Sequence, residues 1–201
     1  MNTAYNVFLG ILQDTKNSDV LYVYLRDYVK PPYDYSDLLR WQWAQSVSAL
    51  DKLVHDLIRI GMLNIFQGTR TPTPKYSSFV IDMDCYSQMI QFPILASSIF
   101  EGQVIRKLSY LSFQEPTKIS DGLALIWSET NKWKKISDKI GLNEDYTKTK
   151  LKNTSIRRNQ IVHEGDYSST LLHRQDIEHS DTLDVIDFVE SVGTAIYQLV
   201  K

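Results

Sequence analysis

Residues 36–61 read SDLLRWQWAQSVSALDKLVHDLIRIG, and this stretch decides the fold. Its apolar residues recur at alternating steps of four and three, the spacing that places side chains on one face of an α-helix. The sequence therefore predicts one long helix with a continuous apolar stripe, against which other helices must pack. The stripe consists of Trp43, Val47, Leu50, Val54, Leu57 and Gly61.

Two shorter helices are expected ahead of this stretch. Apolar residues at positions 7, 8, 11 and 12 predict the first, and residues 20–29 predict the second. Pro31 and Pro32 end the second helix, because a proline has no amide hydrogen to donate. After the long helix, residues 67–84 combine prolines, a glycine and hydroxyl side chains, so they predict a surface loop with a short extended piece at 78–83.

The second half of the chain also has a helical pattern. We expect one helix to begin near Pro93 and another to cover residues 122–140, ended by a left-handed Gly141. A third helix is expected over residues 144–163, ended by Gly165.

The last helix is expected to start at Ser180, a good N-cap, and to bury one stripe of residues between positions 183 and 199. The chain has no strand-turn-strand pattern and no internal repeat. The sequence therefore predicts an all-α helical bundle that forms a single domain over residues 1–201, with residues 1–34 packed on the bundle.

Composition limits the class of protein. The chain has 201 residues, of which 43% are hydrophobic and 23% charged, the balance of a globular domain. Its formal net charge of −2 gives no bulk attraction to nucleic acid or to an anionic membrane. Cys85 has no partner for an internal disulfide, and the sequence lacks both a secretory signal pattern and a membrane-spanning apolar run. We therefore expect a cytoplasmic protein without membrane contact.

Charge is segregated along the chain. Residues 131–160 carry nine basic and three acidic side chains, whereas residues 161–201 carry two basic and eight acidic ones. A solvated helix face explains most such runs, and contacts with nucleic-acid phosphates explain others. Under the second explanation, Lys150, Lys152 and Arg157 are the candidate RNA-binding residues.

The basic stretch ends in RNQIVHEGD, residues 158–166, which combines groups suited to phosphodiester chemistry. His163 carries an imidazole, which can accept or donate a proton near neutral pH. Arg158 carries a guanidinium, which matches the negative charge that grows on a phosphate in the transition state. The alternative is that His163 only binds the free backbone carbonyls of a helix end.

The spacing within this motif has two consequences. His163 follows Arg158 with four residues between them and follows Arg157 with five, so either arginine fits the pattern. Five residues turn about 140° around a helix axis, so Arg158 and His163 do not lie on one face. A cleft between two copies of the chain would bring two arginines and two histidines to one phosphate, and we therefore expect a homodimer.

Arg174 and His179 repeat the four-residue spacing. Asp176 and Glu178 lie between them and would neutralise the arginine and repel a phosphate, so this second match is set aside. His173, Asp176 and His179 do not follow the spacing of a metal-ligand motif. We expect neither a metal ion nor a cofactor.

Three acidic or imidazole side chains are candidates for supporting Arg158 and His163. Asp51 and His55 lie four residues apart on the long helix, so they share a face and the carboxylate can orient the imidazole. Glu164 directly follows His163. A solvated helix face is the alternative for Asp51 and His55.

Two stretches resemble a known superfamily. RRNQIVHEGD, residues 157–166, resembles the active-site motif of HEPN domains, with an asparagine directly after the arginine and an apolar pair before the histidine. WAQSVSALDKLVHDLIRIGM, residues 43–62, resembles the long helix of the RiboL-PSP-HEPN branch. Together the two stretches bracket most of the chain.

The resemblance implies a metal-independent endoribonuclease that is a homodimer with paired motifs at its cleft. It makes Arg158 and His163 the catalytic pair and Asn159 the polar residue beside them. Such an enzyme attacks a phosphate with the adjacent 2′-hydroxyl of RNA and leaves a 2′,3′-cyclic phosphate and a 5′-hydroxyl. The resemblance also implies a toxin or anti-phage defence effector, with an antitoxin or regulatory protein as a partner.

The sequence departs from one group of HEPN toxins, those paired with nucleotidyltransferase antitoxins. These toxins have a tyrosine two residues after the histidine, whereas here that position is Gly165 and Tyr167 follows later. Control by nucleotide transfer to that tyrosine is therefore not expected. The superfamily also contains inactive members, so the alternatives are a non-catalytic module that binds RNA, a nucleotide or a partner protein, and a purely structural helical adaptor.

Overall fold

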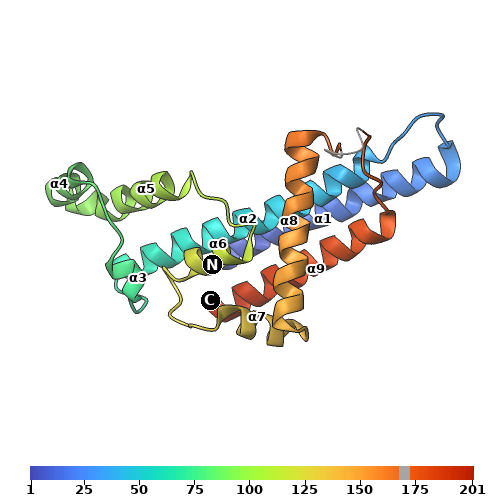
Figure 1. Ribbon diagram of the computed structural model, residues 1–201. Coiled ribbons are helices and arrows are strands. Elements are labelled where there is room, and N and C mark those ends of the chain that lie inside the picture. Colours follow the sequence, from blue (N-terminus) through green and yellow to red (C-terminus); the bar gives the residue numbers. More distant parts are fainter. Residues whose placement is uncertain (168–172) are drawn as a thin grey trace.

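The computed structural model describes residues 1–167 and 173–201, and its regular elements are helices (Figure 1). Within these ranges, extended segments pair only at an isolated antiparallel bridge between Tyr167 and Arg174. The predicted all-α class is confirmed. The elements in chain order are α1 (Asn2–Tyr24), the π-helical turn η1 (Leu25–Val29), α2 (Asp37–Phe66), α3 (Pro74–Ser77), α4 (Met83–Gln91), the 3-10 turn η2 (Pro93–Leu95), α5 (Ala96–Leu108), α6 (Pro116–Leu123), α7 (Lys132–Ile140), α8 (Glu144–Glu164) and α9 (His179–Val200).

Helix α2 forms the centre of the bundle. It contains the stretch predicted to be one long helix, and its stripe residues Val47, Leu50 and Val54 are fully buried. Helices α1 and α9 run alongside α2, and α8 lies across them (Figure 1). Each large side chain buried in this way contributes about 1.5–3 kcal/mol relative to exposure, which explains why this helix organises the fold.

A glycine allows α9 to approach α1 and α2 closely. A Cβ atom built at Gly193 of α9 would overlap the ring of Phe8 and lie 3.1 Å from Cδ2 of Leu53. Phe8 and Leu53 are each only 1% exposed, so neither has space to move aside. The contact between the three longest helices of the bundle core therefore depends on the missing side chain.

The N-terminal region is one helix rather than the two predicted. Helix α1 continues through the polar residues 13–19, because its buried positions Ala4, Phe8 and Leu12 lead on to Thr15 on the same face. The Thr15 hydroxyl donates to the carbonyl of Ile11 at 2.8 Å and is satisfied inside the helix. The element ends before the two prolines, as expected, at a left-handed Lys30.

The loop predicted for residues 67–84 has helical structure and contains no extended strand. Helix α3 begins after Thr73, whose hydroxyl accepts a hydrogen bond from the amide of Tyr76 at 3.0 Å. Helix α4, which the sequence pattern did not reveal, begins at Met83 and packs on α5. Residues 79–82, within the expected extended piece at 78–83, have no regular secondary structure and pair with no strand among the described residues.

The single helix predicted for residues 122–140 is two helices, α6 and α7. The chain turns between them, and the indole nitrogen of Trp133 on α7 donates to the carbonyl of Pro116 on α6 at 2.8 Å. Gly122 lies against Phe113 and Ile58 with no room for a side chain. These contacts hold α6 and α7 in place, and the local sequence pattern does not encode them.

The helix terminators were predicted better than the helix starts. Gly141 and Gly165 both adopt the expected left-handed conformation, with φ of 71° and 62°. The predicted cap at Ser180 is wrong, because α9 begins at His179 after Glu178 and no side chain caps it. Among the helices of the described residues, none is long and apolar enough to cross a lipid bilayer.

Replacing Gly193 by alanine is expected to lower the free energy of unfolding by about 1–3 kcal/mol, because the added methyl group overpacks the core. Gly10 on exposed α1 surface is the matched control, since a Cβ there meets nothing within 4 Å. Gly10→Ala should raise stability by about 0.5–1 kcal/mol through helix propensity. Urea unfolding of both variants measures the difference, and equal effects would show that the close approach is not required.

Candidate active site at the C-terminal end of α8

The motif lies on α8, a helix with well-defined ends. The Asn143 side chain accepts hydrogen bonds from the amides of Asp145 and Tyr146 at 2.9 and 3.2 Å and so caps the first turn. At mid-helix, the indole nitrogen of Trp43 on α2 donates to the carbonyl of Thr154 at 3.0 Å. These contacts fix the position of α8 across the bundle (Figure 1).

Helix α8 has a buried face and an exposed face. Thr147, Leu151, Thr154 and Ser155 are buried toward the bundle. Lys152, Ile156, Asn159 and His163, spaced by four, three and four residues, are exposed on another face. Asn159 and His163 are therefore neighbours on the solvent side of the last two turns.

A buried carboxylate anchors the end of α8. Asp166 is fully buried and has a φ of 65°, which is uncommon for a residue with a side chain. Its Oδ2 accepts from Nε of Arg40 on α2 at 2.7 Å and from Nη2 of Arg157 at 2.8 Å. Its backbone amide donates to the carbonyl of Gln160 at 2.9 Å. Because a buried carboxylate needs charged partners, this cluster ties the motif to the start of α2.

The two adjacent arginines differ in their partners. The Arg157 side chain is 18% exposed and donates further hydrogen bonds to Oε1 of Gln175 at 2.7 Å and to the carbonyl of Asp176 at 2.9 Å. Its guanidinium is thus committed to the anchor. The expected RNA-binding role of Arg157 stays a prediction, and its guanidinium is already hydrogen-bonded within the protein.

Arg158 has no such partner. Its Nη1 donates to Oδ1 of Asn159 at 3.1 Å, and its Nε is buried without a hydrogen-bond partner. Among the described residues, no carboxylate forms an ion pair with Arg158. Of the two spacings that the sequence left open, the structure therefore favours the pair Arg158 and His163.

His163 is exposed in the last turn of α8. Within the part of the chain that the structure describes, its imidazole makes no hydrogen bond or ion pair. The carbonyl of Gln160 at this helix end accepts instead from the amides of Gly165 and Asp166. The alternative role of His163 as a cap for free carbonyls therefore has no support.

The predicted lysines have different surroundings. Lys150 lies 2.7 Å from Oδ2 of Asp184 on α9, and its ammonium lies 4.7 Å from the centroid of the Phe188 ring. Lys152 is exposed and, within the described ranges, has no ion-pair partner. The acidic segment thus packs beside the basic helix and offsets part of its charge.

Asp51 and His55 have polar partners outside the motif, and their supporting role stays a prediction. Oδ1 of Asp51 accepts from the amide of Phe113 at 2.6 Å, and Nε2 of His55 lies 3.2 Å from the carbonyl of Leu111. Both side chains hold the segment after α5 against α2. Glu164, the third candidate, is exposed at the end of α8 and makes no side-chain contact with the other described residues.

The second arginine and histidine match is structural. The guanidinium of Arg174 forms an ion pair with Asp37 and donates to the carbonyl of Gly165 at 3.2 Å. The hydrogen bond to Asp37 raises the pKa of Arg174. His179 lies 2.7 Å from Oδ1 of Asp19. Across residues 1–167 and 173–201, no three His, Cys, Asp or Glu side chains are grouped so as to hold a metal ion.

The model of the RiboL-PSP-HEPN family matches residues 21–201. The chain belongs to this family. The match covers α2, α8 and the motif, so the HEPN resemblance seen in two short stretches extends over nearly the whole chain. No curated protein and no solved structure matches the chain. HEPN domains have ribonuclease or RNA-binding roles, so either role is consistent with the family.

Sequence reasoning missed the anchoring carboxylate of Asp166 and its partner Arg40 on α2. Arg40 is only 5% exposed although it is a charged residue on an amphipathic helix. The sequence pattern does not indicate this burial. Asp166 follows Gly165 directly, and an acid after a helix terminator carries no pattern of its own.

Replacing Asp166 by alanine should lower the free energy of unfolding by about 3–5 kcal/mol, because it leaves buried Arg40 and partly buried Arg157 without a carboxylate. Asp138→Ala is the control, since Asp138 pairs with Lys134 on the exposed surface of α7. That control should cost at most about 1 kcal/mol. Urea denaturation of both variants provides the comparison, and similar losses would argue against the anchor.

Proposed function

We propose that this protein is a metal-independent endoribonuclease whose catalytic residues are Arg158, Asn159 and His163. One observation carries the proposal. Arg158 is a partly buried cation with no carboxylate partner, next to an arginine that is fully committed to the fold. A phosphate supplies the negative charge that Arg158 lacks, and His163 is placed on the same helix end with its imidazole free among the described residues.

The reaction uses the substrate's own nucleophile. His163 accepts the proton of a ribose 2′-hydroxyl, and the 2′-oxygen forms a bond to the adjacent phosphorus. The bond from phosphorus to the 5′-oxygen breaks, and that oxygen takes a proton from an imidazolium. The products are a 2′,3′-cyclic phosphate and a 5′-hydroxyl. Because no water needs activation, the reaction needs no metal ion.

Arg158 and Asn159 act on the phosphate. The guanidinium of Arg158 stabilises the charge that grows on the non-bridging oxygens. Asn159 accepts the hydrogen bond from Nη1 of Arg158, which orients the fork, and its amide group can also donate to the phosphate or to His163. Lys152 supplies a backbone contact further along the exposed face, and Lys150 contributes less because Asp184 neutralises it.

A homodimer completes the site in this proposal. Arg158 and His163 are separated by about 140° around α8, so one helix does not direct both to one phosphate. The side chains of Ile156 and Val162 are 45% and 48% exposed beside the motif, and a two-fold contact between α8 helices would bury them. The His163 of one chain then acts on a phosphate held by Arg158 of the other chain, first as the base and then, as its imidazolium, as the acid.

The biological setting we propose is cytoplasmic defence. Single-stranded or loop RNA is the substrate, since the site is open on the surface of one helix. An enzyme of this kind acts as a toxin or anti-phage effector and requires an antitoxin or regulatory protein to restrain it. Gly165 in place of a tyrosine favours restraint by protein contact over nucleotide transfer.

Purified protein should cleave RNA in the presence of EDTA and leave cyclic phosphate ends. His163→Ala and Arg158→Ala should each lower the rate by at least about 100-fold, the contribution of a general acid or base and of a charge stabiliser. Lys139→Ala is the control, because it removes one charge of the same basic stretch from exposed α7. Loss of cleavage on chelation would contradict the mechanism, and intact RNA with folded protein would point to the RNA-binding alternative.

The dimeric site makes a second prediction. Co-expressed Arg158→Ala and His163→Ala chains form mixed dimers in which each subunit supplies the residue that the other lacks. These mixtures should recover a substantial fraction of the wild-type rate, whereas either variant alone stays inactive. A rate no higher than that of the two separate variants would mean that each chain acts on its own.

A further inference from the structure

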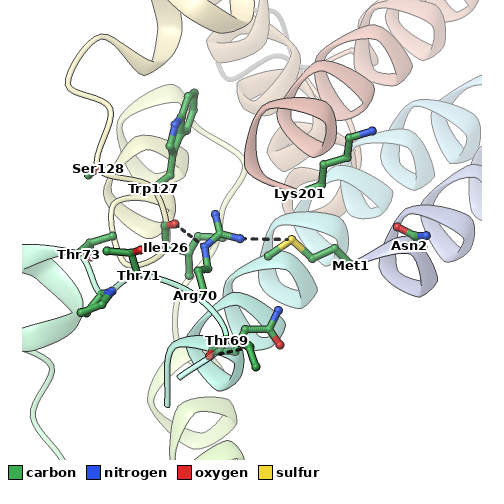
Figure 2. A pocket seen from close by; sticks show the side chains of 12 residues that line it. Met1, Asn2, Thr69, Arg70, Thr71, Thr73, Ile126, Trp127, Ser128 and Lys201 are labelled. Atoms are coloured by element: carbon green, nitrogen blue, oxygen red, sulfur yellow. Dashed lines mark hydrogen bonds between the residues drawn. The ribbon is translucent and has the colours of Figure 1, made fainter. Parts of the chain in front are cut away.

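A polar cavity lies at the opposite end of the bundle from the motif. Its volume is about 600 Å³, within the range of small-molecule sites. It is formed by the first residues of α1, the end of α2 with the segment after it, the turn that follows α6, and the end of α9 (Figure 2). Along α2, the 24 residues from Arg40 to Asn64 span roughly 36 Å, so this cavity is separate from the α8 site.

The lining of the cavity is suited to an anion. Its lining residues include two bases, Arg70 and Lys201, and no aspartate or glutamate, and the ammonium of Lys201 lies over the ring of Tyr197 outside the lining. The hydroxyls of Thr71 and Ser128 and the amide of Asn64 also line it, and among the described residues these three side chains have no hydrogen-bond partner. Hydroxyls and amides that remain free beside a cation are donors available to a ligand.

Arg70 lies at the centre of this lining and is a cation without a counter-ion. Its Nε donates to the carbonyl of Ile126 at 3.1 Å and its Nη1 to the carbonyl of Val200 at 2.7 Å. No carboxylate of the described chain lies within ion-pair distance of it. Burial lowers the pKa of Arg70, and no neighbouring acid counters the effect. Figure 2 shows the guanidinium between the Ile126 carbonyl and the sulfur of Met1.

An aromatic side chain lines the same cavity as Arg70. The half-buried indole of Trp127 lines the cavity on the side across from Lys201 (Figure 2). The ammonium of buried Lys132 lies 5.7 Å from the centroid of that ring. Lys132 also has no ion-pair partner among the described residues, and burial lowers its pKa. Trp127 thus lines the same cavity as Arg70 and has the ammonium of Lys132 near its ring.

We propose that this cavity binds a small molecule that carries a phosphate group next to a flat ring, of the size of a nucleoside monophosphate. Arg70 holds the phosphate through its fork, and the hydroxyls of Thr71 and Ser128 donate to the remaining oxygens. The ring packs on Trp127, because planar bases stack on aromatic side chains without needing a specific sequence. The bound anion supplies the negative charge that Arg70 lacks.

Isothermal titration calorimetry of the full chain with AMP tests this proposal, with inorganic phosphate and adenosine as separate probes. AMP should bind at least about tenfold more tightly than either probe, because phosphate lacks the stacking and adenosine lacks the charge. Equal binding of AMP and inorganic phosphate would reduce the site to a simple anion site and overturn the ring contact. No binding of AMP at millimolar concentration would overturn the whole proposal.

Two variants separate the parts of the site. Arg70→Gln should weaken the binding of both AMP and phosphate at least about tenfold, since a neutral amide replaces the fork. Trp127→Leu should weaken AMP by a similar factor and leave phosphate unchanged. Trp127→Leu decides the question if Arg70→Gln fails to fold, because Trp127 makes no hydrogen bond through its indole in the described chain. AMP binding that survives Trp127→Leu unchanged would contradict the proposed site.

The control variant is His163→Ala, which removes the imidazole of the α8 site. It should leave AMP binding unchanged, so failure of the nuclease proposal and failure of this one are distinguishable. Loss of AMP binding in His163→Ala would place the ligand at the α8 motif and overturn the cavity as its site.

Discussion

The buried carboxylate of Asp166, held between Arg40 and Arg157, is the interaction on which the end of the molecule with the proposed site depends. A carboxylate that is fully buried is stable only with charged partners, so the position of Asp166 fixes the start of α2, the end of α8 and the segment that leads to α9. The backbone amide of Gln175 donates to the carbonyl of Asp166 at 2.9 Å and ties in that last segment. Without this anchor the last turns of α8 would rest on few buried apolar contacts.

The anchor also divides two neighbouring arginines by role. Arg157 points into the cluster and forms its hydrogen bonds there. Arg158 lies one residue and about 100° further around the helix and, among the described residues, has no carboxylate partner. This arrangement suits the proposed phosphate chemistry, because the bonds of Arg157 fix the backbone that positions the guanidinium of Arg158. The exposed His163 and Asn159 then complete the group on a helix whose end cannot shift freely.

Much of the fold was readable from the sequence, and the missing parts share a physical cause. The period of α2, the left-handed glycines at 141 and 165 and the stripe of α9 are local signals, and the structure confirms them. Gly122 and Trp133, at the two sides of the break between α6 and α7, make tertiary contacts, and α4 packs on α5. Contacts of this kind do not appear in a local sequence pattern. The motif at 158–163 was likewise visible in the sequence. The resemblance to HEPN domains assigned Arg158 from the sequence, but the physical difference between Arg157 and Arg158 was not visible there, because it rests on a carboxylate whose partner on α2 is 126 residues away.

The claim that the substrate's 2′-hydroxyl is the nucleophile is tested most directly with a paired substrate. The cleaved position of an RNA is first mapped with wild-type protein, and the same RNA is then synthesised with a single 2′-deoxy nucleotide on the 5′ side of that bond. The account predicts that this RNA resists cleavage at the mapped site in EDTA, while its all-ribose counterpart is cut. Cleavage of the deoxy-substituted bond at an unchanged rate would show that water or another nucleophile attacks, and it would contradict the roles given to His163 and Arg158.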